Sequence, residues 1–299
     1  WGDSEWTIQS SLVIHAGRID SSGNTFGSAM HVGGGLTSRL EINLDDPSES
    51  WTMAGHLTIE GHAAFSLERV AGSRMILTGG LTLASGRARI GSELSIESGA
   101  AVTIGSPTAM LTLTADAAVQ AGAAFSGAGT LVNSGAALLL HHGADLSDVG
   151  LRNAGSLRVG DGAGTAAVDR LLMTDDSLWV VDFLAAGAGT THDLLIVSGG
   201  AATIDGLIEV NVAWPLSAAD LPAPGAEFTI LTALGGVTGM FKNDPVSTDG
   251  SGLSLEWTVI YRENSVALRL DAVVPTPGTA ALAALGLLAA LRRRRGETA

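Results

Sequence analysis

Residues 131–140 read LVNSGAALLL and residues 151–159 read LRNAGSLRV, and these two stretches decide the fold. They share Leu, Asn and Gly at matching positions, and each continues into a second short apolar run. Their period is about 20 residues, the length of one coil of a parallel β-solenoid, whose coils stack and bury a shared core. We expect Asn133 and Asn153 to lie one above the other at a turn, as a structural amide ladder. A binding role for this Asn pair is the alternative.

Short apolar triplets extend the pattern through the first half of the chain. They alternate apolar and small polar residues, which is the period of a strand with one buried face. The triplets are residues 57–59, 75–77, 81–83, 94–96, 102–104 and 111–113. Asn-Gly and Asp-Gly dipeptides, which mark tight hairpins, are nearly absent from this stretch, so the chain is expected to coil in one direction. We predict an all-β fold, with a right-handed parallel β-helix (solenoid) over residues 1–175.

The strands lengthen from about residue 176, and proline residues separate them. The predicted strands are residues 178–183, 193–197, 207–212, 228–231, 253–260 and 266–270. An uncovered terminal coil would leave backbone N–H and C=O groups unpaired. Residues 176–271 are therefore expected to form a β-rich cap module at the open end of the solenoid.

Composition excludes several classes of function. The chain of 299 residues has a formal net charge of −14, with 16 Lys+Arg against 30 Asp+Glu, and it has no Cys. Nucleic acid requires a basic surface, so we expect no nucleic-acid partner. Without Cys there is no disulfide framework and no thiolate zinc site. A hydrophobic fraction of 46% is sufficient for a folded core.

The C-terminal segment is a separate unit. Residues 273–291 read VVPTPGTAALAALGLLAAL, a run without a charge, and they are followed by a basic cluster of Arg292, Arg293, Arg294 and Arg295. An apolar run next to a basic cluster is typical of a membrane segment. A helix starting near Gly278 would be roughly 21 Å long at about 1.5 Å per residue, shorter than the ~30 Å hydrocarbon core. Residues 272–299 are therefore predicted to be a short transmembrane or sorting helix.

The residues Pro275, Thr276, Pro277 and Gly278, followed by the apolar helix and the arginines, resemble a PEP-CTERM sorting signal of exported bacterial proteins. In that family an exosortase, a membrane transpeptidase, processes the protein near the proline motif, often in bacteria that make extracellular polysaccharide. Thr276 stands where the family usually has Glu. Residues 176–271 also resemble the C-terminal module of autotransporter-passenger-like, planctomycete-type surface proteins that end in this signal. The resemblance implies a transient exosortase partner, membrane association before processing, and then a cell-surface or extracellular location.

No motif for catalysis or metal binding stands out. His56 with His62, and the adjacent His141 and His142, lack metal-ligand spacing, and the Asp175-Asp176 pair lacks a calcium-loop pattern. We therefore expect no metal, no cofactor and no catalytic residue. Weak calcium binding by acidic pairs is the alternative to solvated turns. Sugar stacking on tryptophans is likewise the alternative to their packing in the core, for Trp51, Trp179, Trp214 and Trp257.

These features predict a non-enzymatic, exported protein of the cell surface or of an exopolysaccharide matrix. Its repetitive faces would serve a structural or adhesive role toward polysaccharide or the cell envelope. The alternative is a β-helix enzyme, a polysaccharide lyase or glycoside hydrolase that uses surface carboxylates. A groove that gathers three acidic side chains would favour the enzyme.

Overall fold

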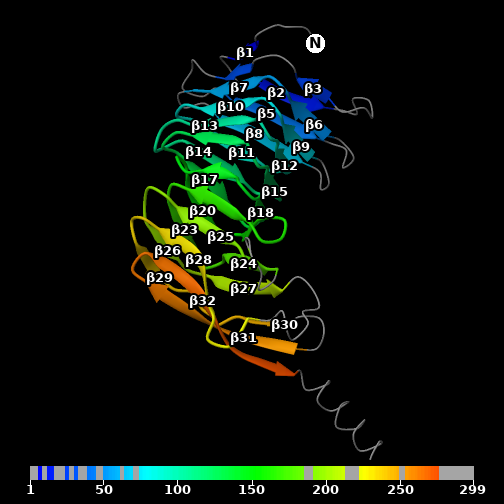
Figure 1. Ribbon diagram of the computed structural model, residues 1–299. Coiled ribbons are helices and arrows are strands. Elements are labelled where there is room, and N and C mark those ends of the chain that lie inside the picture. The colour runs from blue at the N-terminus through cyan, green and yellow to red at the C-terminus, as the bar shows by residue number, and fades with distance from the viewer. Residues whose placement is uncertain are drawn as a thin grey trace, which may run out of the picture.

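Three parallel β-sheets wind around a common core in the computed structural model, and an antiparallel extension closes one end (Figure 1). The structure describes residues 6–8, 12–16, 24–26, 30–32, 39–44, 50–60, 64–69, 74–184, 191–212, 222–248 and 253–275. Every helix or strand within these ranges is a β-strand. The predicted all-β class and the parallel solenoid are therefore confirmed.

The first sheet has 13 strands and continues from the solenoid into the antiparallel extension. In sheet order its strands are β1 (Trp6–Ile8), β4 (Met30–Val32), β7 (His56–Ile59), β10 (Gly80–Leu83), β13 (Ala101–Ile104), β16 (Ala124–Ser126), β19 (Asp145–Leu146), β22 (Thr165–Val168), β25 (Leu194–Val197), β28 (Glu227–Ala233), β32 (Ser265–Pro275), β31 (Leu253–Arg262) and β30 (Val246–Thr248).

The second and third sheets have 10 and 9 strands. The second sheet contains β2 (Leu12–Ala16), β5 (Arg39–Leu44), β8 (Ala64–Arg69), β11 (Arg87–Ile90), β14 (Met110–Leu113), β17 (Thr130–Asn133), β20 (Gly150–Asn153), β23 (Leu171–Met173), β26 (Ala202–Ile204) and β29 (Val237–Gly239). The third contains β3 (Asn24–Phe26), β6 (Ser50–Met53), β9 (Arg74–Leu77), β12 (Glu93–Ile96), β15 (Ala117–Val119), β18 (Ala137–Leu140), β21 (Ser156–Val159), β24 (Leu178–Phe183) and β27 (Leu207–Val212). Each regular coil thus contributes one strand to each sheet.

Aliphatic side chains stack in columns inside the coil. Leu81 pairs with Leu57 of the preceding coil and with Val102 of the next, and all three side chains are buried. The small polar residue of each triplet, such as Thr82 or Thr103, points outward between them. Each fully buried aliphatic side chain contributes about 1.5–3 kcal/mol to folding. All six predicted triplets lie within strands of the structure.

A Gly-Ala corner turns the chain from the third sheet into the first. Gly99 and Gly122 have φ of 83° and 79°, a backbone conformation that L side chains rarely adopt. The following residues, Ala100 and Ala123, are buried, and their N–H groups bond to the carbonyl three residues earlier, as in a type II turn. Gly143 repeats this corner in the next coil.

Asn133 and Asn153 occupy paired positions at the ends of β17 and β20. Both are fully buried, and Asn133 Nδ2 donates to Asn153 Oδ1 at 2.7 Å. The same Nδ2 group lies 2.9 Å from the Ala136 carbonyl oxygen, at the corner that leads into the third sheet. This is the stacking that the shared Leu, Asn and Gly positions predict. Asn133 Oδ1 has no partner in the described part of the chain, because the paired position in the preceding coil is Leu113.

The coil does not keep one length. Leu131 pairs with Leu151, whereas Leu178 pairs with Leu207, so the later coil contains more residues than the earlier one. Only the strands must stack, so the connections between them are free to lengthen. The parallel coil also continues past the boundary expected at residue 175, because β24 to β27 and then β28 and β29 all pair in parallel with the preceding coil. Residues 176–271 therefore divide between late coils and the antiparallel extension.

β28 is the strand at which the direction of pairing reverses. It pairs in parallel with β25 on one side and antiparallel with β32 on the other, with a register shift between Thr229 and Leu231. β31 and β30 follow in antiparallel order. The predicted strand 266–270 is longer in the structure, since β32 runs on to Pro275. The extension lies at the opposite end of the stack from β1 (Figure 1).

Replacing Asn133 by Ala should destabilise the solenoid by about 2–3 kcal/mol, because buried acceptors at Ala136 and Asn153 lose their donor. Urea unfolding measures the loss. Ser134→Ala, at an exposed position in the same corner, is the matched control. In the double variant Asn133→Ala/Asn153→Ala the combined loss should be smaller than the sum of the single losses, since the two amides share one hydrogen bond. Equal midpoints for Asn133→Ala and Ser134→Ala would contradict the ladder.

Candidate functional site

The first of the expected sorting residues lies at the C-terminal end of the described residues. Pro275 is the last residue of β32 and pairs with Leu253 of β31. Thr276, Pro277 and Gly278 lie outside the described residues, as do Arg292, Arg293, Arg294 and Arg295. The described residues include no helix that is long and apolar enough to cross a membrane.

Among the candidate histidines and tryptophans, four described side chains have structural contacts. His56 Nε2 lies 2.8 Å from Thr82 Oγ1, and His142 Nδ1 accepts the Thr165 N–H at 3.1 Å. Trp179 and Trp257 are buried at 0% and 3% exposure, so they pack in the core and present no stacking platform. Trp214 and His62 lie outside the described residues. Within the described ranges no group of three or more His, Asp or Glu side chains is arranged to hold a metal ion.

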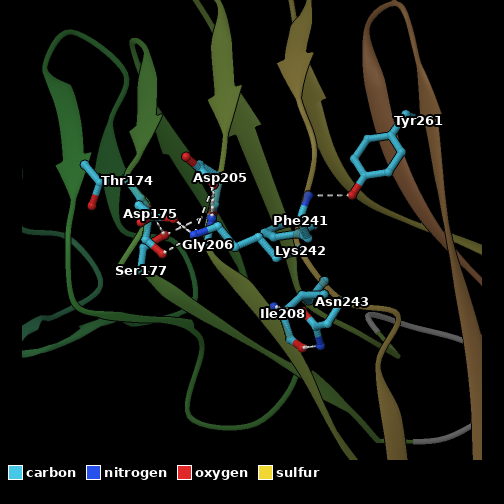
Figure 2. A network of polar contacts seen from close by, with 10 residues as sticks. All are labelled: Thr174, Asp175, Ser177, Asp205, Gly206, Ile208, Phe241, Lys242, Asn243 and Tyr261. Atoms are coloured by element: carbon cyan, nitrogen blue, oxygen red, sulfur yellow. Dashed lines mark hydrogen bonds and ion pairs between the residues drawn. The ribbon is translucent and has the colours of Figure 1, made fainter.

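The polar groups of interest gather where the last coils meet the antiparallel extension. Lys242, the only lysine of the chain, forms an ion pair with Asp175 and lies 3.9 Å from Asp205 (Figure 2). Its backbone N–H donates to the Gly206 carbonyl at 2.9 Å. Gly206 has a φ of 82°, and a Cβ there would lie 2.3 Å from the Ser177 carbonyl oxygen. One cation thus joins the corners of two coils to the segment that follows β29.

Two side chains and one backbone carbonyl take the place of the next coil at this end. The Asn243 carboxamide pairs with both backbone groups of Ile208 in β27: its Oδ1 accepts the N–H at 3.0 Å and its Nδ2 donates to the carbonyl at 2.9 Å. The Tyr261 hydroxyl accepts the Phe241 N–H at 2.7 Å (Figure 2). The Glu263 carbonyl accepts the Val237 N–H of β29 at 2.8 Å. These contacts satisfy strand-edge groups that another coil would otherwise pair.

A partly buried ion pair lies on the outer face of the third sheet. Arg158 of β21 binds Asp182 of β24 through Nε at 2.7 Å and Nη2 at 3.0 Å. Asn211 of β27 donates to Asp182 Oδ1 at 2.7 Å, so the carboxylate accepts hydrogen bonds from two neighbouring strands. Asp182 is fully buried, whereas the Arg158 side chain is 42% exposed. Hydrogen bonding to Asp182 raises the pKa of the Arg158 guanidinium above its ordinary value. The cluster joins three successive coils.

Asp193 is a second buried carboxylate, next to this pair. Its oxygens accept the Gly164 N–H at 2.9 Å and the Asp182 N–H at 2.8 Å, while its own N–H donates to the Asp182 carbonyl. Burial raises the pKa of Asp193 to about 8, although the two N–H donors act in the opposite direction. Burial also lowers the pKa of the neighbouring His192, whose Nε2 lies 2.9 Å from the Thr229 carbonyl oxygen. Asp193, just before β25, is thus bonded to Asp182 near the end of β24, which ties together the two ends of the connection between these strands.

A cavity of about 450 Å³ lies between β27 and the start of β30. Its described lining is Leu178, the whole of β27, and Asn243, Pro245, Val246 and Ser247. The Leu207 N–H donates to the Ser177 carbonyl, so alternate residues of β27 direct their backbone groups toward β24. The backbone groups of Ile208, Val210 and Val212 therefore point the other way, toward the cavity. Asn243 bonds to those of Ile208.

Sequence reasoning missed most of this region. Arg158 and Asp182 lie far apart along the chain and contact each other only because their strands are neighbours. Lys242 is conspicuous as the only lysine, but nothing in its local sequence indicates Asp175 as its partner. The Asn243 carboxamide bonds to Ile208 as the backbone of a neighbouring strand would, and no spacing rule predicts that role.

Replacing Asn243 by Ala should lower stability by about 1–3 kcal/mol, because both backbone groups of Ile208 lose their partner. Asn243→Asp keeps the acceptor but places a carboxylate oxygen against the Ile208 carbonyl, so its loss should be at least as large. Asp244→Ala, at the adjacent exposed position, is the control. Chemical unfolding measures stability, and analytical ultracentrifugation should show more self-association in Asn243→Ala through the bared strand edge. The capping role would be wrong if Asn243→Ala matched Asp244→Ala in both measurements.

Asp193 should make stability dependent on pH. Its folded pKa of about 8 lies above the ordinary 3.8, so the folded state keeps a proton that the unfolded state releases. This contribution is complete below about pH 4 and is lost as pH rises through about 8, at up to about 1.4 kcal/mol per pH unit. Asp193→Asn should flatten the fall in urea midpoint between pH 5 and 8, and the exposed control Asp148→Asn should not. An unchanged slope in Asp193→Asn would refute this assignment.

The arrangement at this end is thus a set of buried or paired charges that fasten the last coils, together with an open cavity on a partly covered strand edge. Comparison of the chain with protein-family models and with characterised proteins found no match. The geometry of the described residues is therefore the basis for a functional assignment.

Proposed function

We propose that the chain is a non-enzymatic, exported protein of the cell surface or of an extracellular polysaccharide matrix, delivered by its C-terminal segment. The observation that carries the proposal is the position of Pro275. It ends β32, the last described strand, and begins the Pro-Thr-Pro-Gly motif that resembles a PEP-CTERM signal. A processing enzyme would meet the motif directly after a closed β-solenoid, so removal of the tail would leave the body intact.

The solenoid suits a structural or adhesive role. Its stacked strands present long, regular faces, and its C-terminal end is closed by side chains and by antiparallel strands. The proposal includes a right-handed coil, since parallel crossovers in one sheet are right-handed in nearly all proteins. It also includes a short membrane helix within residues 272–299, and a transient exosortase-type transpeptidase as partner.

The acidic residues near Arg158 favour this role over the enzymatic alternative. Asp161, Asp182 and Asp193 all act electrostatically to raise the pKa of Arg158. However, Asp182 and Asp193 are fully buried and satisfied by internal donors. A glycosidase or lyase needs carboxylates that reach the substrate. We propose that this cluster stabilises the stacking of successive coils.

The test is expression with a signal peptide in a host that has an exosortase and in a matched host without one. Mass spectrometry of the C-terminus should show loss of residues near 278–299 only in the first host, with the body at the surface or in the medium. Pro275→Ala/Pro277→Ala should reduce processing, and Thr276→Glu, which restores the family's usual residue, should preserve or increase it. An intact tail on a protein that stays in the cytoplasm of both hosts would overturn the proposal.

A further inference from the structure

The cavity beside β27 differs from the polar clusters around it. Some backbone groups in its wall have no hydrogen-bond partner among the described residues. The backbone groups of Val210 and Val212 point toward it, as shown by the strand alternation and by the contact of Asn243 with Ile208. They supply donors and acceptors in alternation along one wall. A ligand rich in hydroxyl groups, which both donate and accept, fits such a wall.

The rest of the lining adds one charge and an apolar rim. Glu209 is exposed and is the only charged residue among the described lining residues. Leu207 and Val246 are 47% and 62% exposed, and they form apolar surfaces on the two sides, from β27 and β30. A volume of about 450 Å³ lies in the usual range of small-molecule sites, about 300–1,000 Å³. The lining thus combines neutral hydrogen-bonding groups, C–H surfaces and a single anion.

We propose that this cavity binds a cationic amino-sugar unit of an extracellular polysaccharide. The hydroxyl groups would bond to the edge of β27, the C–H faces would lie against Leu207 and Val246, and the ammonium group would pair with Glu209. A net charge of −14 disfavours acidic polysaccharides and favours a cationic one. The inference rests on the proposed matrix function, for which it names the partner and the binding residues.

The experiment compares two sugars that differ chiefly in charge. The full chain is titrated by calorimetry at low salt with a hexamer of glucosamine and with a hexamer of N-acetylglucosamine, at a pH at which the free amines are protonated. The unmodified chain should bind the glucosamine hexamer about two- to fivefold more tightly, the range expected of a partly exposed ion pair.

Glu209→Gln removes the charge and keeps the shape, so it should abolish the preference for the glucosamine hexamer. Glu93→Gln is the matched control: the same substitution at an exposed position of the same sheet, outside the cavity. Val246→Lys places a cation on the exposed rim and should weaken binding of the glucosamine hexamer by a similar factor. Unfolding midpoints of the three variants should stay near that of the unmodified chain, since all three positions are exposed.

Equal affinity of the unmodified chain for the two hexamers would overturn the inference, as would a preference that survives Glu209→Gln. Tighter binding of an acidic polymer such as alginate would also overturn it. Binding to the purified chain does not depend on export or on tail processing. A missing sugar preference therefore contradicts this inference alone, whereas an unprocessed cytoplasmic protein contradicts the proposed function alone.

Discussion

The pairing of backbone groups between successive coils is the constraint on which the rest of the structure depends. In a parallel stack every second residue directs its N–H and C=O toward the coil before it, and the others toward the coil after it. Each coil therefore needs a following coil to pair with, and the last coil needs other hydrogen-bonding groups in its place. Here the substitute is assembled from the Asn243 carboxamide, the Tyr261 hydroxyl and the Glu263 carbonyl, while β28 and β32 convert the first sheet to antiparallel pairing.

The same constraint explains where the charges lie. Within the regular coils the interior is narrow and is filled by aliphatic columns such as Leu57, Leu81 and Val102. The connections lengthen in the late coils, where adjacent strands no longer hold each other through short corners alone. Buried carboxylates appear there, and Asp182 and Asp193 bind backbone and side-chain donors from separate coils. Internal donors satisfy the oxygens of both groups, although burial still raises the pKa of Asp193 to about 8. The contribution of these groups is therefore chiefly to fix the arrangement.

The sequence predicted those features of the fold that the local periodicity of apolar residues controls. The alternating triplets and the shared positions of Asn133 and Asn153 indicated the strand class, the parallel stack and the internal amide pair. Parallel pairing continues past the boundary expected at residue 175, because longer strands and prolines signal a change in connection length and not in pairing. Contacts such as Arg158 with Asp182 depend on register between coils of unequal length, and the spacing of residues along the chain does not contain that information.

A cap made of side chains covers a strand edge residue by residue, and this is why the closed end of the solenoid is also where a ligand can bind. Asn243 reaches Ile208, and the neighbouring groups at Val210 and Val212 are directed toward an open cavity. A further coil would have paired all three residues and left no cavity. The groups proposed to recognise a hydroxyl-rich ligand are thus the cavity-facing backbone groups of β27 to which the Asn243 carboxamide does not bond. Glu209, the exposed residue between Ile208 and Val210, adds the charge that selects among such ligands.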